Sequence, residues 1–359
     1  MNQLEQARAQ IDTVDRQMAA LFEQRMAAVR QVIEYKQATG MPILDSGREA
    51  QVIEKNTAYI AEEVLRPYYA DLLRAQMALS RQYQAYVLGR DVVAHQGAEG
   101  AYSHIALTRL FPRARALSLA TFDEVFDAVQ DGRAAYGVIP FENSTAGDVS
   151  DVLDLLYNHS LYIVQMYDLP IRHNLLGVPG AHLRDVTDVY GHPQALRQSE
   201  AFLTKTGLAT HSWPPQAPNN ALAAQYVAAQ KDPTKAATAS AEAAALYGLE
   251  VLAEDINTDS DNTTRFIVLS REKPTAGNRF SLLFTLDNKP GKLAEVIQVI
   301  GASGYDMESI KSRPLPHVPF DYYFYVELVG DPAAEKTAAL LRELNHVCRT
   351  VRLLGVYTK

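Results

Sequence analysis

The chain has 359 residues, of which 47% are hydrophobic, and it carries a formal net charge of −8. This length favours two or three domains with sizeable cores, and the acidic balance argues against a nucleic-acid partner. The single cysteine, Cys348, excludes an internal disulfide and is typical of a reducing, cytoplasmic compartment. No signal peptide or membrane-spanning run is recognised, so no membrane partner is expected. Walker A, GxGxxG, HExxH and CxxC patterns are all absent from the sequence, and neither a cofactor nor a metal is predicted.

The first 86 residues are predicted to be helical. Apolar residues recur at helical spacing, and nothing interrupts them before Gly40 and Pro42. A second helix is expected from about residue 45 and a third over about residues 67–86. A first helix of nearly forty residues needs a partner to pack on. The sequence therefore predicts an all-α, dimerising N-terminal domain over residues 1–88.

Several polar residues of these helices fall on shared faces. Arg25 and Lys36 are eleven residues apart, which returns them to nearly the same face about 16 Å apart. Their long side chains would converge on a small dianion. Ser80 and Gln84 form an i,i+4 pair on the third helix. The simpler interpretation is a solvated surface, and residues 46–49 also fit a capping box.

As a set, these polar residues resemble the binding set of the all-helical chorismate mutases. The resemblance holds without departure at eight positions: Arg8, Arg25, Lys36, Asp45, Arg48, Glu49, Ser80 and Gln84. It implies rearrangement of chorismate to prephenate, a pericyclic step that needs no nucleophile, metal or cofactor. Negative charge develops on the ether oxygen as its bond stretches, so fixed cations and donors aimed there are the main means of catalysis.

The resemblance also implies roles for these residues. Arg8 and Arg25 suit the two carboxylates of chorismate, since a planar guanidinium binds a carboxylate through two hydrogen bonds. Lys36 and Gln84 suit the ether oxygen, and the two acidic residues suit the ring hydroxyl. Arg8 and Lys36 are 28 residues apart, about 42 Å along one helix. Both act on one small molecule only if Arg8 comes from a second subunit.

After a short linker at residues 86–90, strands and helices alternate. Strands are predicted at residues 91–95, 135–140, 186–191 and 236–239. This βαβ order predicts a parallel-rich sheet. A long apolar run over residues 161–178 is expected to carry the chain into a second lobe, and ligand is expected in the crevice between the lobes, at the carboxyl ends of the strands. We assign this α/β domain to residues 91–271.

Four loops fall at such strand ends, namely residues 97–104, 142–147, 192–195 and 262–266. Turn chemistry explains each loop taken singly. Together they resemble the four motifs of prephenate dehydratases, and Thr264-Arg265-Phe266 resembles the signature tripeptide of that family. The resemblance implies a two-lobed fold like that of periplasmic binding proteins.

Prephenate dehydratases remove carbon dioxide and water together, and aromatisation drives the formation of phenylpyruvate. A donor near the departing ring hydroxyl is the key requirement, and the resemblance assigns this role to Thr264. The remaining candidates are Ser103, Glu142, Asn143, Ser144, Gln194 and Arg265. Arg265 either binds a carboxylate or is structural, and Glu142 is either an acid or an orienting group. Ser103 beside His104 does not predict a serine hydrolase, since adjacent residues rarely face each other and no nucleophile elbow is present.

Beyond a second linker, residues 279–359 predict a βαββαβ order, which is ferredoxin-like. Residues 288–293 resemble the effector loop of ACT domains, and residues 311–314 resemble the second ACT motif of this family. The implied effector residues, at an interface between two ACT domains, are Gly291, Lys292, Leu293, Ser312, Arg313 and Pro314. Phenylalanine is the implied inhibitor.

Position 311 departs from the ACT motif. Lysine stands there in place of the usual glutamate. Near the ammonium group of the effector, Lys311 would weaken inhibition by like charge, and Lys311→Glu would strengthen it. If Lys311 points to solvent, the change has little effect.

The whole chain thus resembles a bifunctional chorismate mutase–prephenate dehydratase of phenylalanine biosynthesis, with a homodimer or higher homo-oligomer implied. The alternative is a ligand-binding regulator, in which a two-lobed module carries an ACT sensor and the helical segment only dimerises. The arginine, lysine and glutamine set within residues 8–84 favours the enzyme. A helix that only dimerises would carry leucine at those positions.

Overall fold

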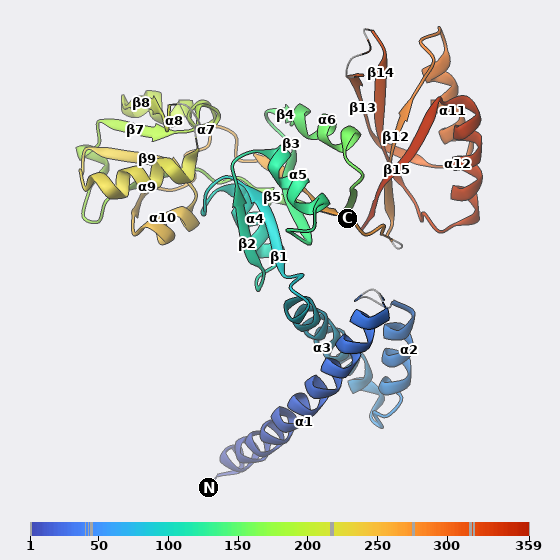
Figure 1. Ribbon diagram of the computed structural model, residues 1–359. Coiled ribbons are helices and arrows are strands. Elements are labelled where there is room, and N and C mark those ends of the chain that lie inside the picture. The colour runs from blue at the N-terminus through green and yellow to red at the C-terminus, as the bar shows by residue number, and fades with distance from the viewer. Residues whose placement is uncertain are drawn as a thin grey trace. The chain divides into compact units, whose positions relative to one another are not determined.

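The computed structural model describes residues 2–39, 41, 43, 46–215, 219–274, 277–315, 318 and 320–358. It divides into two compact units, Met1–Asp91 and Val92–Lys359 (Figure 1). Within the described ranges, no helix is long and apolar enough to cross a membrane. The same residues contain no cluster of histidine, cysteine and acidic side chains that would hold a metal ion.

The first unit is helical, as predicted. It consists of α1 (Gln3–Thr39), α2 (Ser46–Thr57), the short 3-10 helix η1 (Glu63–Leu65) and α3 (Arg66–Val87). Its buried apolar residues are few: Ile33, Ala70, Leu73 and Met77. Every described residue of α1 before Arg25 is exposed. With one buried residue, a helix of this length gains little of its stability from packing within one chain.

The second unit begins with a lobe built on the main sheet. Its strands are β1 (Val92–Gln96), β2 (Arg115–Leu119), β3 (Tyr136–Asn143), β4 (Gly147–Asp148), β5 (Tyr162–Pro170) and β11 (Thr263–Ser270). The covering helices are α4 (Tyr102–Leu110), α5 (Phe122–Gln130) and α6 (Ser150–Asn158). A capping box formed by Thr121 and Glu124 begins α5.

The sheet of this lobe is mixed rather than parallel-rich. β1 pairs in parallel with β2 and β3, but β11 runs antiparallel to both β3 and β5. The reason lies in the path of the chain, which leaves this lobe after β5 and re-enters it through β11. Alternation of apolar residues encodes the faces of a strand and not its direction.

The second lobe has a five-stranded sheet in the order β10-β6-β9-β7-β8. The strands are β6 (Asn174–Gly177), β7 (Asp188–Gly191), β8 (Ala209–Ser212), β9 (Lys235–Ala239) and β10 (Glu250–Ala253). The helical segments are η2 (Leu183–Asp185), α7 (Pro193–Gln198), α8 (Glu200–Thr206), α9 (Asn220–Gln230) and α10 (Ala241–Tyr247). The predicted two-lobed central domain is therefore confirmed.

Two connections join the lobes, and a side chain links them. Asn257 accepts a hydrogen bond from the amide of His173 at 2.6 Å and donates one to the carbonyl of Ile171 at 3.0 Å. The amide of Ile256 also donates to the carbonyl of His173 at 2.8 Å. The two connecting segments are thereby held in a fixed register.

The C-terminal segment has the predicted βαββαβ order. It contains β12 (Arg279–Thr285), α11 (Lys292–Ala302), β13 (Asp306–Pro314), β14 (Tyr322–Val329), α12 (Glu335–Val347) and β15 (Thr350–Tyr357). The strand order β13-β14-β12-β15 is ferredoxin-like. Figure 1 shows α11 and α12 on one side of this sheet. One hydrophobic core lies between these helices and the strands.

The other face of these strands joins the core of the first lobe. Tyr325 packs on Phe141 with ring centroids 5.3 Å apart, and Tyr323 stacks on Tyr157 at 4.8 Å. β15 also pairs in parallel with β5, so one continuous sheet runs through both segments. At this junction a Cβ on Gly355 would lie 2.4 Å from the carbonyl oxygen of Ile163, so the close approach requires glycine.

Candidate active sites

The helical unit brings two of the predicted mutase residues, Arg25 and Ser80, into contact. Arg25 on α1 donates a hydrogen bond to Oγ of Ser80 on α3, and burial lowers the pKa of the Arg25 guanidinium below its ordinary value. Lys36, later on α1, donates to the carbonyl oxygen of Ile43. Gln84 is 7% exposed, and its Oε1 has no hydrogen-bond partner in the described part of the chain. A buried polar atom of this kind needs a partner, and a bound ligand is one candidate.

The other mutase candidates are not seen hydrogen-bonded to, or ion-paired with, Arg25 or Ser80 in the described part of the chain. Glu49 on α2 forms an ion pair with Arg81 on α3. Arg81 was not among the predicted residues, although it follows Ser80 directly in the sequence. Arg48 is exposed beside Glu49, and Asp45 lies outside the described residues. Arg8 is exposed near the start of α1, about 42 Å along the helix from Lys36.

In the second unit, Asn143 is the centre of a hydrogen-bond network at the carboxyl end of β3. Its Nδ2 donates to Oδ1 of Asn262 at 2.8 Å and to Oγ1 of Thr264 at 2.9 Å. Its Oδ1 accepts from the amides of Thr145 at 3.1 Å and Ala146 at 2.9 Å. Those amides require an oxygen, so the orientation of the Asn143 side chain is fixed. Asn143 and Thr264 are 7% and 9% exposed.

Strand pairing explains why these two residues meet. Thr264 lies directly opposite Asn143 in the antiparallel ladder of β11 and β3. Ser144 secures the same strand ends, because its Oγ donates to the carbonyl of Asp261 at 3.2 Å and accepts from the amide of Thr263 at 3.0 Å. The contacts of Ser144 are thus those of a structural residue.

The second lobe contributes Gln198, the last residue of α7. Its Nε2 donates to Oγ1 of Thr145 at 2.8 Å, and its Oε1 is 2.9 Å from Nε2 of His173. Nδ1 of His173 is 3.0 Å from the hydroxyl of Tyr102, and burial lowers the pKa of His173. We call the chain of contacts from His173 through Gln198 and Thr145 to Asn143 and Thr264 the interlobe network.

Sequence reasoning chose Gln194 and missed Gln198. The two lie four residues apart, so they share a face of α7, and this spacing is the signal that was available. Gln194 is half-buried, and its amide donates to Nδ1 of His192 at 3.1 Å. Ser103 is buried in the first turn of α4, and Nδ1 of its neighbour His104 accepts from the amide of Gly100 at 3.2 Å.

Glu142 and Arg265 face away from the interlobe network. Successive residues of a strand point to opposite faces, so the neighbours of Asn143 and Thr264 lie on the other side of the sheet. Arg265 binds the carboxylate of Asp168 through Nε at 2.9 Å and Nη2 at 3.2 Å. Hydrogen bonding to Asp168 raises the pKa of Arg265. Of the two roles left open for Arg265, this geometry favours the structural one.

Lys311 on β13 reaches the same face of the sheet. Its side chain is 8% exposed, and its Nζ contacts Oδ1 of Asp148 and lies 3.3 Å from Oε2 of Glu142. Lys311 therefore does not point to solvent, which removes one of the two alternatives considered for it. Arg313, two residues further along β13, binds Asp154 of α6, which also accepts from the hydroxyl of Tyr323 at 2.6 Å.

The predicted effector residues divide between two places. A cavity of about 120 Å³ at the start of α11 is lined by Lys292 and Leu293, together with Asn288 and Phe320. Gly291 precedes them with a φ of 84°, a left-handed conformation that favours glycine. Ser312, Arg313 and Pro314 do not line this cavity.

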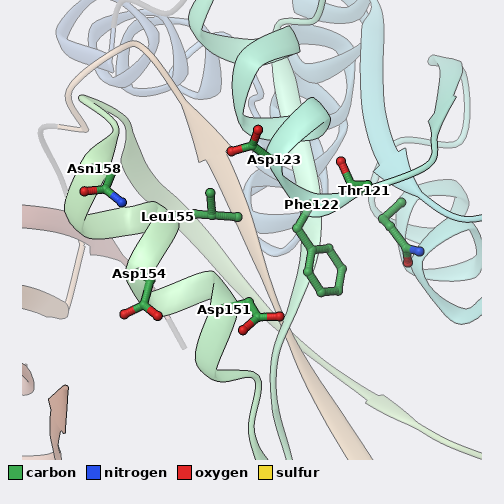
Figure 2. A pocket seen from close by; sticks show the side chains of 8 residues that line it. Thr121, Phe122, Asp123, Asp151, Asp154, Leu155 and Asn158 are labelled. Atoms are coloured by element: carbon green, nitrogen blue, oxygen red, sulfur yellow. The ribbon is translucent and has the colours of Figure 1, made fainter. Parts of the chain in front are cut away.

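A larger cavity, of about 390 Å³, lies between α5 and α6 (Figure 2). Phe122 and Leu155 line it together with three carboxylates, those of Asp123, Asp151 and Asp154. None of the predicted site residues does so. Its acidic lining disfavours a dianion such as prephenate, so size alone does not mark the active site.

Comparison with known proteins identifies the two families that the sequence motifs resemble. The chain matches the family model of prephenate dehydratase over residues 93–274 and that of chorismate mutase type II over residues 7–85. It is 29% identical to the bifunctional chorismate mutase/prephenate dehydratase of Aquifex aeolicus (strain VF5), covering 100% of this chain and 99% of that protein. It is 36% identical to arogenate dehydratase/prephenate dehydratase 2, chloroplastic, of Arabidopsis thaliana, covering 88% of this chain and 86% of the relative.

Solved structures resemble the second unit. The prephenate dehydratase of Arthrobacter aurescens in complex with L-Phe superposes with a TM-score of 0.67 at 26% identity, covering 75% of this chain and 90% of that one. GqqA, described as a novel type of quorum quenching acylase, superposes with a TM-score of 0.68 at 34% identity, covering 74% and 97%. The chain belongs to the prephenate dehydratase family and joins a dehydratase domain to a type II chorismate mutase domain, as its bifunctional relatives do.

Proposed function

We propose that residues 1–88 rearrange chorismate to prephenate, that residues 91–271 convert prephenate to phenylpyruvate, and that residues 279–359 respond to phenylalanine. The observation that carries the dehydratase assignment is the hydrogen bond from Asn143 Nδ2 to Thr264 Oγ1. A hydroxyl group has one proton and two acceptor sites. Because Asn143 occupies an acceptor site of Thr264, the Thr264 proton is available to the departing hydroxyl of prephenate.

Donation from Thr264 meets the main chemical need of this step. The ring hydroxyl is a poor leaving group unless it receives a proton or a strong hydrogen bond as its bond breaks. Asn143 fixes the threonine side chain, and Gln198 fixes the loop at Thr145 from the second lobe. Prephenate bound between the lobes would then lose carbon dioxide and its ring hydroxyl in one concerted event driven by aromatisation. The hydroxyl leaves as hydroxide, which accepts a hydrogen bond from Thr264 while Thr264 keeps its proton.

The mutase assignment is supported by cations held in place on the helices. Arg25 and Lys36 supply positive charge for chorismate, and Gln84 supplies a neutral donor whose amide does not titrate. Arg8 completes the site from a second subunit, so we propose a homodimer or a higher homo-oligomer. The exposed apolar residues of α1 that would meet the partner helix are Leu4, Ile11, Val14, Met18 and Leu21.

We place the enzyme in the cytoplasm, where the free, buried thiol of Cys348 stays reduced. The direct test of both activities is to mix the full chain with chorismate. Chorismate absorbance should disappear, and both prephenate and phenylpyruvate should be found. Stoichiometric binding without turnover would favour the ligand-binding regulator instead.

Regulation by phenylalanine is proposed on two grounds. A relative of the same fold was solved in complex with L-Phe, and in this chain Lys292 and Leu293 line a small cavity beside Gly291. Phenylalanine should lower the dehydratase rate in a titration. A flat response together with no calorimetric binding would make this segment a dimerisation module.

A further inference from the structure

The hairpin of β3 and β4 carries two carboxylates directly opposite each other. Glu142 pairs with Asp148, and Asn143 pairs with Gly147, in the same short ladder. Like charges in direct cross-strand register repel each other and destabilise the pairing. This hairpin also positions Asn143, so its conformation matters to the interlobe network.

Lys311 supplies the charge that offsets this repulsion. Its ammonium group contacts Asp148 and lies 3.3 Å from Glu142. It also lies 4.8 Å from the ring centroid of Phe141. With a side chain only 8% exposed, Lys311 is poorly screened by solvent. One cation from the C-terminal segment thus bridges both strands of the hairpin.

Among the described residues, Arg265 also approaches one of these carboxylates, but it does not take over this role. Arg265 approaches Glu142 only to 3.8 Å, and Asp168 engages its guanidinium at 2.9 Å. β13 is itself held against the first lobe, since Arg313 binds Asp154. Lys311 is therefore delivered to the hairpin by a strand that is anchored two residues away.

We propose that Lys311 is a positioning residue of the dehydratase site, which holds the hairpin of residues 142–148 in the conformation that presents Asn143 to Thr264. This inference rests on the proposed dehydratase function. The glutamate usual in the resembling motif would add a third carboxylate at this place, so the arrangement belongs to a chain with lysine at 311. It makes the C-terminal segment part of the catalytic assembly even without an effector.

The test is a double-mutant cycle on the full chain, with kcat and KM measured for prephenate. K311M removes the charge and keeps most of the stem, and D148N removes one of the two opposed carboxylates. We expect K311M to lower kcat by about tenfold to a hundredfold, the loss typical of a slightly misplaced catalytic group. K311R should keep most of the activity, and K311M/D148N should regain most of kcat because the repulsion is gone.

Three controls keep the outcome decisive. The mutase rate of each variant reports the amount of functional helical unit and should not change. The N–H groups of Thr145 and Ala146 donate to Asn143. Their hydrogen exchange should be faster in K311M and should return to the wild-type rate in K311M/D148N. If K311M alone does not fold, D148N and K311M/D148N repeat the comparison, and the proposal expects their kcat values to agree within about twofold.

Wild-type kcat in K311M, or a tenfold gap between D148N and K311M/D148N, would overturn the role of Lys311 while leaving the dehydratase assignment intact. A wild-type chain that consumes chorismate but never prephenate would overturn the dehydratase assignment itself, and the role of Lys311 with it.

Discussion

The helical unit and the interlobe network build their sites in opposite ways. The helical site relies on charged side chains, and one of them, Arg8, stands on a stretch of α1 where every residue is exposed. The interlobe network relies on neutral Asn143 and Thr264, both less than a tenth exposed and joined within one chain. A dianion that develops charge needs cations, whereas a departing hydroxyl needs one well-aimed donor. On our proposal the helical site is assembled from two chains, whereas the hydrogen bond between Asn143 and Thr264 forms within one chain.

The largest expected effect is on the neutral site. Thr264→Ala removes the donor to the leaving hydroxyl, so dehydratase turnover should fall by about a thousandfold or more. Chorismate consumption should continue, and prephenate should accumulate. Both products are followed by chromatography after mixing the variant with chorismate.

Thr263→Ala is the matched control for this prediction. Thr263 is the preceding residue of β11, and its hydroxyl donates to the carbonyl of Asp261 at 3.3 Å. The Thr263→Ala variant should retain most dehydratase activity. Equal losses of dehydratase activity in the two variants would show that the activity depends on the structure of the strand end rather than on the Thr264 hydroxyl.

Substitutions in the proposed mutase site should lower turnover by a smaller factor than Thr264→Ala lowers dehydratase turnover. Arg25→Ala or Lys36→Ala should lower mutase turnover by about a hundredfold, or about 3 kcal/mol for one lost cation. Dehydratase turnover on added prephenate should not change, because that site contains neither residue. Arg30→Ala is the control, since Arg30 also reaches α3, where it donates to the Tyr83 hydroxyl at 2.8 Å. A near-normal mutase rate in both Arg25→Ala and Lys36→Ala would contradict the assignment of these residues to the mutase site.

Local patterns in the sequence predicted most elements of this fold. Helical spacing predicted α1 and α3, whereas residues 262–266, which were predicted as a loop, lie in β11 from Thr263 onward. β2 went unpredicted because its burial pattern is largely exposed and gives no clear alternation. Strand direction was also missed, since it depends on the return of the chain from the second lobe.

Sequence reasoning missed the contacts that join residues far apart in the chain. Gln198 acts through Thr145, 53 residues earlier in the chain. Lys311 contacts Asp148 across 163 residues, and no local pattern encodes that contact. Asn143 and Thr264 were chosen as candidates because each lies in a recognisable motif, whereas their hydrogen bond follows from strand register.

Subunit complementation tests whether the helical site is shared. Arg8→Ala and Lys36→Ala chains, unfolded together and refolded, should recover up to about a quarter of the wild-type mutase activity. Half of the dimers are then mixed, and each mixed dimer has one intact site out of two. Arg25→Ala mixed with Lys36→Ala should recover nothing, because both residues come from the same chain. Proven mixed dimers without activity would place Arg8 outside the site.

The smallest effect at neutral pH concerns stability and again separates the two units. Residues 1–91 contain no histidine, whereas His95 on β1 is fully buried, with its ring 5.1 Å from that of His104. Burial, with a smaller contribution from His104, lowers the pKa of His95 from 6.5 to about 4. The unfolded chain therefore binds more protons than the folded chain between these two values. Protonation of His95 in the unfolded chain therefore lowers the free energy of unfolding as the pH falls below 6.5. The loss is roughly 1 kcal/mol at pH 5.5.

Trp213, the only tryptophan, lies in the second unit, so its fluorescence during urea unfolding reports that unit alone. Its unfolding free energy should decline between pH 6.5 and pH 5, and His95→Gln should reduce that slope because glutamine does not titrate. His346→Gln, at an exposed position of α12, should leave the slope unchanged. An identical slope in His95→Gln and the wild type would mean that other groups set the acid sensitivity. Helical ellipticity of an isolated segment 1–88, if it folds, should lack this dependence, because no histidine is present to be protonated.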